Sequence, residues 1–164
     1  MKSTQSTQTL ASMLIAKDWK IALAESCTGG LVCATLTELS GSSEWFERGY
    51  ITYSNEAKTE CLGVPPELIE SHGAVSEPVA QAMAEGAKQA SGANVAISIT
   101  GIAGPSGGSA EKPVGTVCFG WAIGISSSEN RILSKTMHFD GDRSAVREQA
   151  KDYALTQLIA LLRN

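Results

Sequence analysis

Ser26 lies in the run AESCTGG (residues 24–30), between an apolar stretch at 21–23 and an apolar-periodic segment at 31–39. This order predicts a hydroxyl at the point where a strand ends and a helix begins. Such a turn presents a side chain at the carboxyl edge of a sheet, and the unpaired N–H groups of the helix create a positive potential beside it. Nucleophiles and anion sites both use this location. The simpler alternative is that Ser26 or Thr28 caps the helix.

Lys58 falls in the first turn of a predicted helix that Ser54 or Asn55 caps. The positive end of the helix dipole disfavours an ammonium group there and lowers the pKa of a lysine, whereas Glu56 in the same turn favours the charged form. A neutral amine can act as a general base, and a Ser/Lys pair activates a hydroxyl without histidine. We therefore interpret Lys58 as a candidate base. The alternative is a solvated surface lysine.

Two neighbouring side chains offer further chemistry. Tyr53, at the end of a predicted strand, could donate to an oxyanion or pass a proton, although most tyrosines in such strands pack. Cys27 could replace Ser26 as the nucleophile, since a helix N-terminus lowers the pKa of a thiol. The alternative for Cys27 is a buried packing role, because the adjacent helix is apolar and no histidine lies close in sequence.

A glycine-rich loop, GIAGPSGGS (residues 101–109), follows the apolar strand-like run that ends at Thr100. The loop has neither the order of a P-loop nor that of a dinucleotide-binding fingerprint. Because it leaves a buried strand, it should reach the same sheet edge as Ser26. We therefore expect this loop to contact a ligand.

Arg143 and Arg147 lie four residues apart at the start of the predicted last helix, on one face. Two guanidinium groups in this arrangement could clamp a substrate phosphate through paired hydrogen bonds. The alternative is that they form ion pairs with nearby carboxylates, which are Asp140, Asp142 and Glu148.

Strands that alternate with helices predict a three-layer α/β/α domain whose sheet is mostly parallel with one antiparallel strand. Strands are predicted over residues 20–25, 48–53, 95–100, 114–123 and 131–139, the last two as an antiparallel hairpin joined around 126–130. Leu10, Met13, Leu14 and Trp19 recur at helical spacing and predict an amphipathic N-terminal helix before the first strand. Further helices are predicted over 29–39, 55–62, 67–71 and 76–91, with a last one after Asp140 or Asp142.

The chain has 164 residues, a net charge of -4 and no long basic run. This length suits a single domain over residues 1–164 whose core needs no disulfide or metal. The charge balance argues against a nucleic-acid surface, although it allows a discrete nucleotide pocket. No segment has the pattern of a membrane span or of a signal-peptide core.

Cysteine and histidine usage points to chemistry without a cofactor. The cysteines show no C-x-x-C spacing and are expected to pack as free thiols in a reducing cytoplasm. His72 and His138 lie outside any metal-binding motif, so we expect no metal. The apolar N-terminal helix and the edge of the hairpin leave room for a homodimer. The cysteines are Cys27, Cys33, Cys61 and Cys118.

Taken together, five segments resemble the CinA C-terminal domain family. Freestanding members of this family are nicotinamide-nucleotide amidases, which hydrolyse nicotinamide mononucleotide to nicotinate mononucleotide and ammonia in pyridine-nucleotide salvage, a branch of NAD metabolism. This sequence looks like one of them, because the larger N-terminal domain of full CinA proteins has no counterpart in it. The segments are AESCTGG (24–30), GYITYSNEAK (49–58), HGAVS (72–76), GIAGP (101–105) and KPVGTV (112–117).

The resemblance implies a three-layer α/β/α fold without a metal, and a catalytic serine, lysine and tyrosine that fall on Ser26, Lys58 and Tyr53. Backbone N–H groups near residues 28–30 or at Gly101 should then hold the oxyanion. The alternative in the same fold is a non-catalytic module that binds a phosphorylated ligand and regulates a partner. The residues expected to contact substrate, with Arg143 as our own inference for the phosphate, are Thr28, Gly29, Gly30, Asn55, Thr100, Gly101, Ala103, Gly104 and Arg143.

Overall fold

The structure is a computed structural model that describes residues 3–124 and 129–164. Within these ranges the helices are α1 (Ser3–Lys17), α2 (Leu31–Thr37), α3 (Asn55–Leu62), α4 (Pro66–His72), α5 (Glu77–Ser91) and α6 (Arg143–Leu162). The strands are β1 (Ile21–Glu25), β2 (Phe46–Ile51), β3 (Val95–Gly101), β4 (Thr116–Gly124) and β5 (Asn130–His138). A short 3-10 turn, η1 (Ser42–Glu44), precedes β2.

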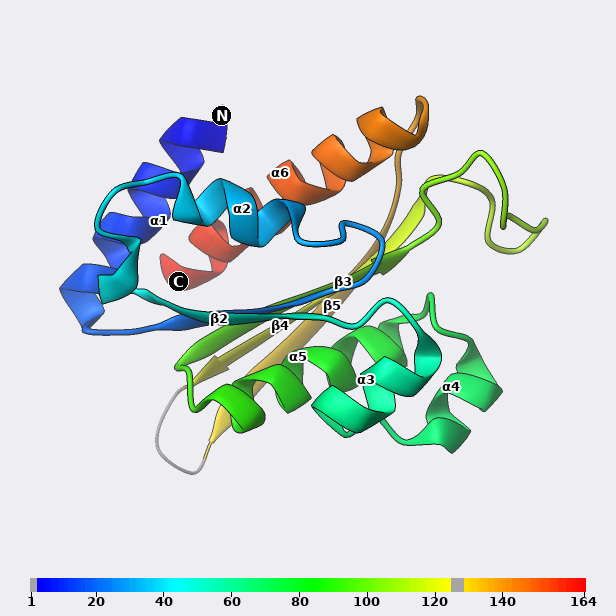
Figure 1. Ribbon diagram of the computed structural model, residues 1–164, viewed down its shortest axis with the longest axis horizontal. Coiled ribbons are helices and arrows are strands. Elements are labelled where there is room, and N and C mark those ends of the chain that lie inside the picture. Colours follow the sequence, from blue (N-terminus) through cyan, green and yellow to red (C-terminus); the bar gives the residue numbers. More distant parts are fainter. Residues whose placement is uncertain (1–2, 125–128) are drawn as a thin grey trace.

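The described strands form one sheet in the order β2-β1-β3-β4-β5. β1 pairs in parallel with β2 and β3, whereas β4 is antiparallel to both β3 and β5. Helices α1, α2 and α6 cover one face of the sheet, and α3, α4 and α5 cover the other (Figure 1). The predicted three-layer α/β/α fold, with one reversed strand in a mostly parallel sheet, is confirmed.

The face under α1, α2 and α6 is packed with large side chains. Phe119 and Trp121 project from β4, and their rings stack at a centroid distance of 5.7 Å. Tyr153 of α6 lies 4.9 Å from Phe119, and the indole N–H of Trp121 donates to the Ala154 carbonyl at 3.2 Å. These contacts fix α6, and with it the arginines of its first turns, against the sheet.

The opposite face is packed with small side chains. Ser98 donates its hydroxyl to the Ala80 carbonyl of α5 at 2.5 Å, and a Cβ added to Gly120 would lie 2.4 Å from the same carbonyl. This close approach is possible because α5 buries the small side chains of Ala80, Ala84 and Ala87. The thin layer brings α3, which packs against α5, close to the end of β2.

Polar side chains begin the helices as the sequence indicates. Ser54, Ser76 and Asp142 cap α3, α5 and α6, each accepting the N–H of the residue three positions later. Several predicted boundaries were shifted, two of them clearly. The helix expected at 29–39 covers only Leu31–Thr37, because Gly30 has a φ of 105° and ends the preceding turn. The strand expected at 48–53 is shifted to Phe46–Ile51.

The predicted connection around residues 126–130 lies largely outside the described residues, which resume at 129. The strands on either side of it, β4 and β5, are antiparallel neighbours as predicted. Parallel strands β1, β2 and β3 all end at the same edge of the sheet, toward the right in Figure 1. This edge carries the candidate site.

Candidate active site

Ser26 and Lys58 meet at the carboxyl edge of the sheet. Ser26 follows β1 directly, and its backbone N–H donates to the Ile99 carbonyl of β3 at 2.9 Å. Lys58 Nζ donates to Ser26 Oγ at 3.1 Å. The structure therefore places a candidate base within hydrogen-bonding distance of a candidate nucleophile that lies 32 residues away in the sequence.

The Lys58 side chain is buried, with 1% of its surface exposed. Its Nζ also donates to the carbonyl oxygens of Thr52 at 2.8 Å and Tyr53 at 3.2 Å, in the connection between β2 and α3. Within residues 3–124 and 129–164, it forms no ion pair with a carboxylate. All three of its acceptors are neutral oxygens.

Burial lowers the pKa of Lys58 below its ordinary value, and the nearby Cys27 opposes this effect to a smaller extent. The prediction of a lowered pKa is supported, but burial is the main cause rather than the helix dipole that the sequence suggested. The alternative of a solvated surface lysine is wrong. An amine that is taken out of water without a counter-ion loses its proton more readily.

Ser26 does not cap α2, and neither does Thr28. The N-cap residue of that helix is Gly30, which has no side chain to accept a bond. The carboxylate of Glu25, at the end of β1, instead accepts the free N–H groups at the start of α2, which are those of Gly30, Val32 and Cys33, at 2.9 to 3.2 Å. The Ser26 hydroxyl is thus available for other contacts, and it lies 3.4 Å from the Tyr53 carbonyl.

A cavity of about 290 Å³ opens beside Ser26 and Lys58. It lies between the turn after β1, the start of α3, the glycine-rich loop after β3 and the start of α6. Six of the nine residues expected to contact substrate line it. They are Asn55, Thr100, Gly101, Ala103, Gly104 and Arg143.

The three remaining residues, Thr28, Gly29 and Gly30, are not among the residues that line this cavity. The N–H of Gly29 donates to the Ser26 carbonyl at 3.0 Å, and that of Gly30 donates to Glu25. Their expected role as oxyanion donors is therefore a poor fit, because both groups are already used within the turn. The Thr28 hydroxyl is buried and has no partner among the described residues.

Tyr53 and Arg143 meet at the mouth of the cavity. Tyr53 is 62% exposed, and its phenolic oxygen accepts a hydrogen bond from Arg143 Nη2 at 3.4 Å. The other terminal nitrogen of Arg143 donates to the Gly104 carbonyl at 2.9 Å. Arg143 thus joins the start of α6 to the glycine-rich loop and to the connection after β2.

The two arginines do not form the expected clamp. Arg147 turns toward the Ser26 turn, where its Nε donates to the Cys27 carbonyl at 3.2 Å and its Nη2 to the Thr28 carbonyl at 3.0 Å. Neither arginine makes an ion pair in the part of the chain that the structure describes. The alternative of ion pairs with neighbouring carboxylates is therefore wrong as well.

Cys27 lines the same cavity but is a poor nucleophile. Burial raises the pKa of its thiol to about 11, and the charges of Arg147 and Lys58 only partly offset this. Because the thiolate is the reactive form of cysteine, a thiol with this pKa is inert near neutral pH. The geometry thus favours Ser26 over the adjacent cysteine.

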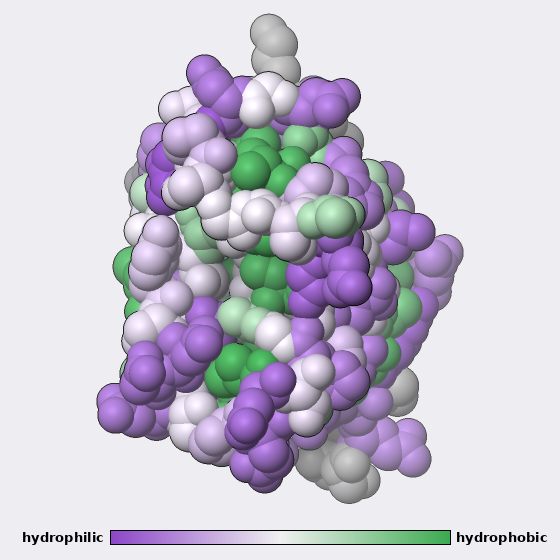
Figure 2. Space-filling view, turned by 90° about the vertical axis from the view of Figure 1, so that its right-hand side faces the viewer, coloured by the Kyte–Doolittle hydropathy of each residue, from purple (hydrophilic) through white to green (hydrophobic). Residues whose placement is uncertain are grey.

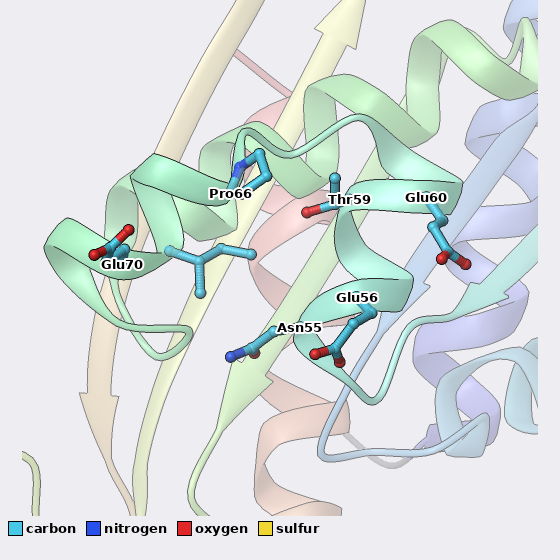
Figure 3. A pocket seen from close by; sticks show the side chains of 7 residues that line it. Asn55, Glu56, Thr59, Glu60, Pro66 and Glu70 are labelled. Carbon is cyan, nitrogen blue, oxygen red and sulfur yellow. The ribbon is translucent and has the colours of Figure 1, made fainter.

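A second hollow, of about 400 Å³, lies between α3 and α4 and shares Asn55 with the first. Figure 3 shows Glu56 projecting from α3 and Glu70 from α4 around it. Its other lining residues are Thr59, Glu60, Pro66 and Ile69. Its lining residues include no hydroxyl bonded to a buried amine, as Ser26 is to Lys58, so we place the candidate chemistry at the smaller cavity.

The edge that carries the site is turned toward the viewer in Figure 2, where apolar surface in the middle lies between hydrophilic margins. Among the described residues, no three His, Cys, Asp or Glu side chains gather as they would around a metal ion. No helix in the same residues combines the length and the apolar character needed to cross a membrane.

Comparisons with known proteins show the family to which the chain belongs. The model of the CinA C-terminal domain family matches residues 3–162. The chain is 51% identical over 156 residues to the nicotinamide-nucleotide amidohydrolase PncC of Enterobacter agglomerans, covering 94% of this chain and 93% of that protein. It is 50% identical to PncC of Escherichia coli K12 over 154 residues, covering 94% and 91% of the two chains.

The chain is also similar to part of a longer relative and to the whole of a solved structure. A CinA-like protein of Mycolicibacterium paratuberculosis is 55% identical over 143 residues, which are 87% of this chain but 33% of that protein. The crystal structure of the competence damage-inducible protein A from Klebsiella pneumoniae has a TM-score of 0.94 at 36% identity, covering 100% of this chain and 99% of that one. A chain that matches the family model over nearly its whole length, and family structures over all of it, belongs to the CinA C-terminal domain family.

Proposed function

We propose that this protein hydrolyses the carboxamide of nicotinamide mononucleotide to nicotinate mononucleotide and ammonia, with Ser26 as the nucleophile and Lys58 as the base. The observation that carries the mechanism is the 3.1 Å contact between Ser26 Oγ and a buried lysine without a counter-ion. The substrate is suggested by the two relatives named nicotinamide-nucleotide amidohydrolase, each about half identical over more than nine-tenths of both chains.

In the first step, the neutral amine of Lys58 takes the proton of Ser26 while Oγ attacks the carboxamide carbon. The Thr52 and Tyr53 carbonyls accept two hydrogens from Nζ and so aim its lone pair at Oγ. The carboxamide oxygen becomes an oxyanion. Collapse of this intermediate breaks the C–N bond and leaves an ester on Ser26.

The oxyanion needs N–H donors that are not already bonded. Among the described residues, the N–H groups of Cys27 and Thr28 donate to no other group, in contrast to those of Gly29 and Gly30. Cys27 follows the nucleophile and lines the cavity, and the residue after a nucleophilic serine supplies this donor in other hydrolases. We therefore assign the Cys27 N–H, rather than the glycines, to the oxyanion.

The leaving group departs as ammonia after it receives a proton from the Lys58 ammonium or from the Tyr53 hydroxyl. Water then cleaves the ester, with Lys58 again acting as the base. Arg143 is the cationic side chain at the mouth of the cavity. We assign it to the substrate phosphate, whose binding holds the ring against Ser26.

The reaction fits a reducing compartment such as the cytoplasm, where pyridine nucleotides are salvaged. The four cysteines of the chain are free thiols. Cys27 is buried in the apolar core, and the buried Cys118 places its Sγ 3.4 Å from the Thr136 hydroxyl.

The decisive experiment measures ammonia released from nicotinamide mononucleotide by the purified chain. Ser26→Ala should reduce the rate by about 10,000-fold or more, because the covalent route is lost. Ser43→Ala, at an exposed position in η1, is the matched control and should release ammonia at the wild-type rate.

Equal rates in the wild type and Ser26→Ala would rule out the serine mechanism. Titration calorimetry with the same nucleotide distinguishes an enzyme from a module that binds the nucleotide without hydrolysing it. Saturable binding with no ammonia release by the wild type would identify a non-catalytic module.

A further inference from the structure

Glu25 is a fully buried carboxylate directly before the proposed nucleophile. One of its oxygens accepts the N–H groups of Gly30 at 3.2 Å and Val32 at 3.0 Å, and the other accepts that of Cys33 at 2.9 Å. The first turn of α2 is thereby tied to the end of β1. A carboxylate with this many backbone donors is held in a single place.

Arg147 holds the same turn from the opposite element. Its guanidinium donates to the carbonyls of Cys27 and Thr28, at 3.2 and 3.0 Å, from the second turn of α6. It makes no ion pair among the described residues, so these carbonyls are its main partners. Its planar, two-pronged contact fixes direction as well as distance.

The turn between these two charges has little stiffness of its own. It is the segment 26–30, Ser-Cys-Thr-Gly-Gly, in which Gly29 and Gly30 have φ values of 55° and 105°. Glycine in such conformations allows the turn but does not enforce it. Glu25 accepts the N–H of Gly30 at the end of the segment and those of Val32 and Cys33 just beyond it, and Arg147 donates to the two carbonyl groups in its middle.

We propose that Glu25 and Arg147 are positioning residues that together hold the 26–30 turn so that Ser26 Oγ stays in reach of Lys58 Nζ. This inference rests on the proposed role of Ser26. Neither residue lines the cavity beside Ser26. Their loss should therefore lower kcat and leave KM nearly unchanged, because the substrate loses no direct contact.

The main test is a set of variants at Arg147. Arg147→Met keeps an unbranched side chain but removes both donors, and kcat should fall by about 100-fold, the cost of a misplacement near 1 Å. Arg147→Lys keeps the charge and one donor and should recover part of the loss. Arg48→Met is the matched control, because Arg48 is exposed, pairs with the adjacent Glu47 and does not line the cavity, and it should keep the wild-type kcat.

Glu25→Gln tests the other half of the turn. The glutamine oxygen can still accept from one side, but its NH₂ group then faces a backbone N–H with no acceptor between them. We expect kcat to fall by about tenfold to 100-fold, again with KM unchanged. Glu47→Gln is the matched control. If Glu25→Gln does not fold, as judged by its circular dichroism spectrum, the Arg147 variants decide the proposal alone.

A second readout does not depend on the amide substrate. A fluorophosphonate forms a bond from phosphorus to the serine oxygen and releases fluoride, so its labelling rate measures the reactivity of Ser26 itself. Labelling should slow in Arg147→Met and Glu25→Gln by the same factor as kcat, and Ser26→Ala should remove it. If nicotinamide mononucleotide is not hydrolysed but Ser26 is labelled, the proposed substrate fails while the positioning role is still measured.

Two results would overturn the inference. One is a folded Arg147→Met variant whose kcat and labelling rate lie within about twofold of the wild type, a change too small for a displaced nucleophile. The other is a loss confined to KM, which would place Arg147 in substrate binding.

Discussion

Among residues 3–124 and 129–164, two lysines are almost completely buried, Lys58 at the start of α3 and Lys151 in the middle of α6. Lys151 extends its ammonium to two carboxylates, Glu148 at 2.5 Å and Asp152 at 3.6 Å, each about half exposed to solvent. Lys58 extends its Nζ to three neutral oxygens at the edge of a cavity.

The difference between the two lysines lies in charge compensation rather than in depth. In a buried lysine that reaches a carboxylate, the charge is paired while the carbon stem covers apolar surface. A buried lysine that contacts only carbonyl and hydroxyl oxygens is desolvated without a compensating negative charge, so its neutral form is favoured. Burial alone would not have distinguished a structural lysine from a candidate base.

The largest expected effect comes from removing each lysine in turn. Lys58→Met should lower kcat for ammonia release by about 100-fold to 10,000-fold, the usual contribution of a general base. Lys151→Met should keep kcat within about twofold of the wild type, because it leaves the site untouched. Comparable losses in the two variants would mean that Lys58 acts through the fold rather than as a base.

The pH dependence of the rate should sharpen the comparison. Lys58 must be neutral to act as a base, so kcat/KM should rise with pH as this lysine loses its proton. Since burial lowers the pKa of Lys58, the midpoint of this rise should lie below the ordinary value of 10.5. The Lys151→Met variant should show the same midpoint. A midpoint at or above the ordinary value would contradict a desolvated base.

The same lowered pKa predicts a pH-dependent stability. Between the folded pKa of Lys58 and the ordinary value of 10.5, the unfolded chain binds a proton at this residue that the folded chain does not. The free energy of unfolding contributed by Lys58 therefore rises with pH across that window. Urea titrations at several pH values should show this slope in the wild type and a reduced slope in Lys58→Met.

The smallest effect is expected for stability at Lys151. Methionine preserves the packed stem and loses ion pairs whose carboxylates are half exposed, so Lys151→Met should change the free energy of unfolding by about 1 kcal/mol or less. Thermal or urea denaturation measures this value. A loss of several kcal/mol would show that the ion pairs of α6 matter more than their exposure suggests.

Much of the fold could be predicted from the sequence because its signals are local. Ser76 with Pro78 begins α5 and Gly92 ends it, as this pattern predicts. The boundaries of β2 were missed for a different reason. Thr52 and Tyr53 have strand-forming side chains, but their carbonyls turn toward Lys58, a contact that depends on how α3 folds back.

The candidate site could be predicted only in part. Ser26 stood out because it lies in a strand-to-helix turn, where nucleophiles are presented, and Lys58 because a lysine is disfavoured in the first turn of a helix. Glu25 was missed, although an acidic residue closing an apolar strand is a signal of a buried, bonded carboxylate. The separate targets of Arg143 and Arg147 could not have been found from spacing, because both lie on one helix face and the difference arises from the loops opposite them.

The oxygens that hold Lys58 have a consequence for engineering. Two of the three are main-chain carbonyls, at Thr52 and Tyr53. The backbone conformation between β2 and α3 therefore determines the position of the amine. A serine and a lysine copied onto another scaffold would not reproduce this geometry. The part that must be transplanted is the backbone connection itself.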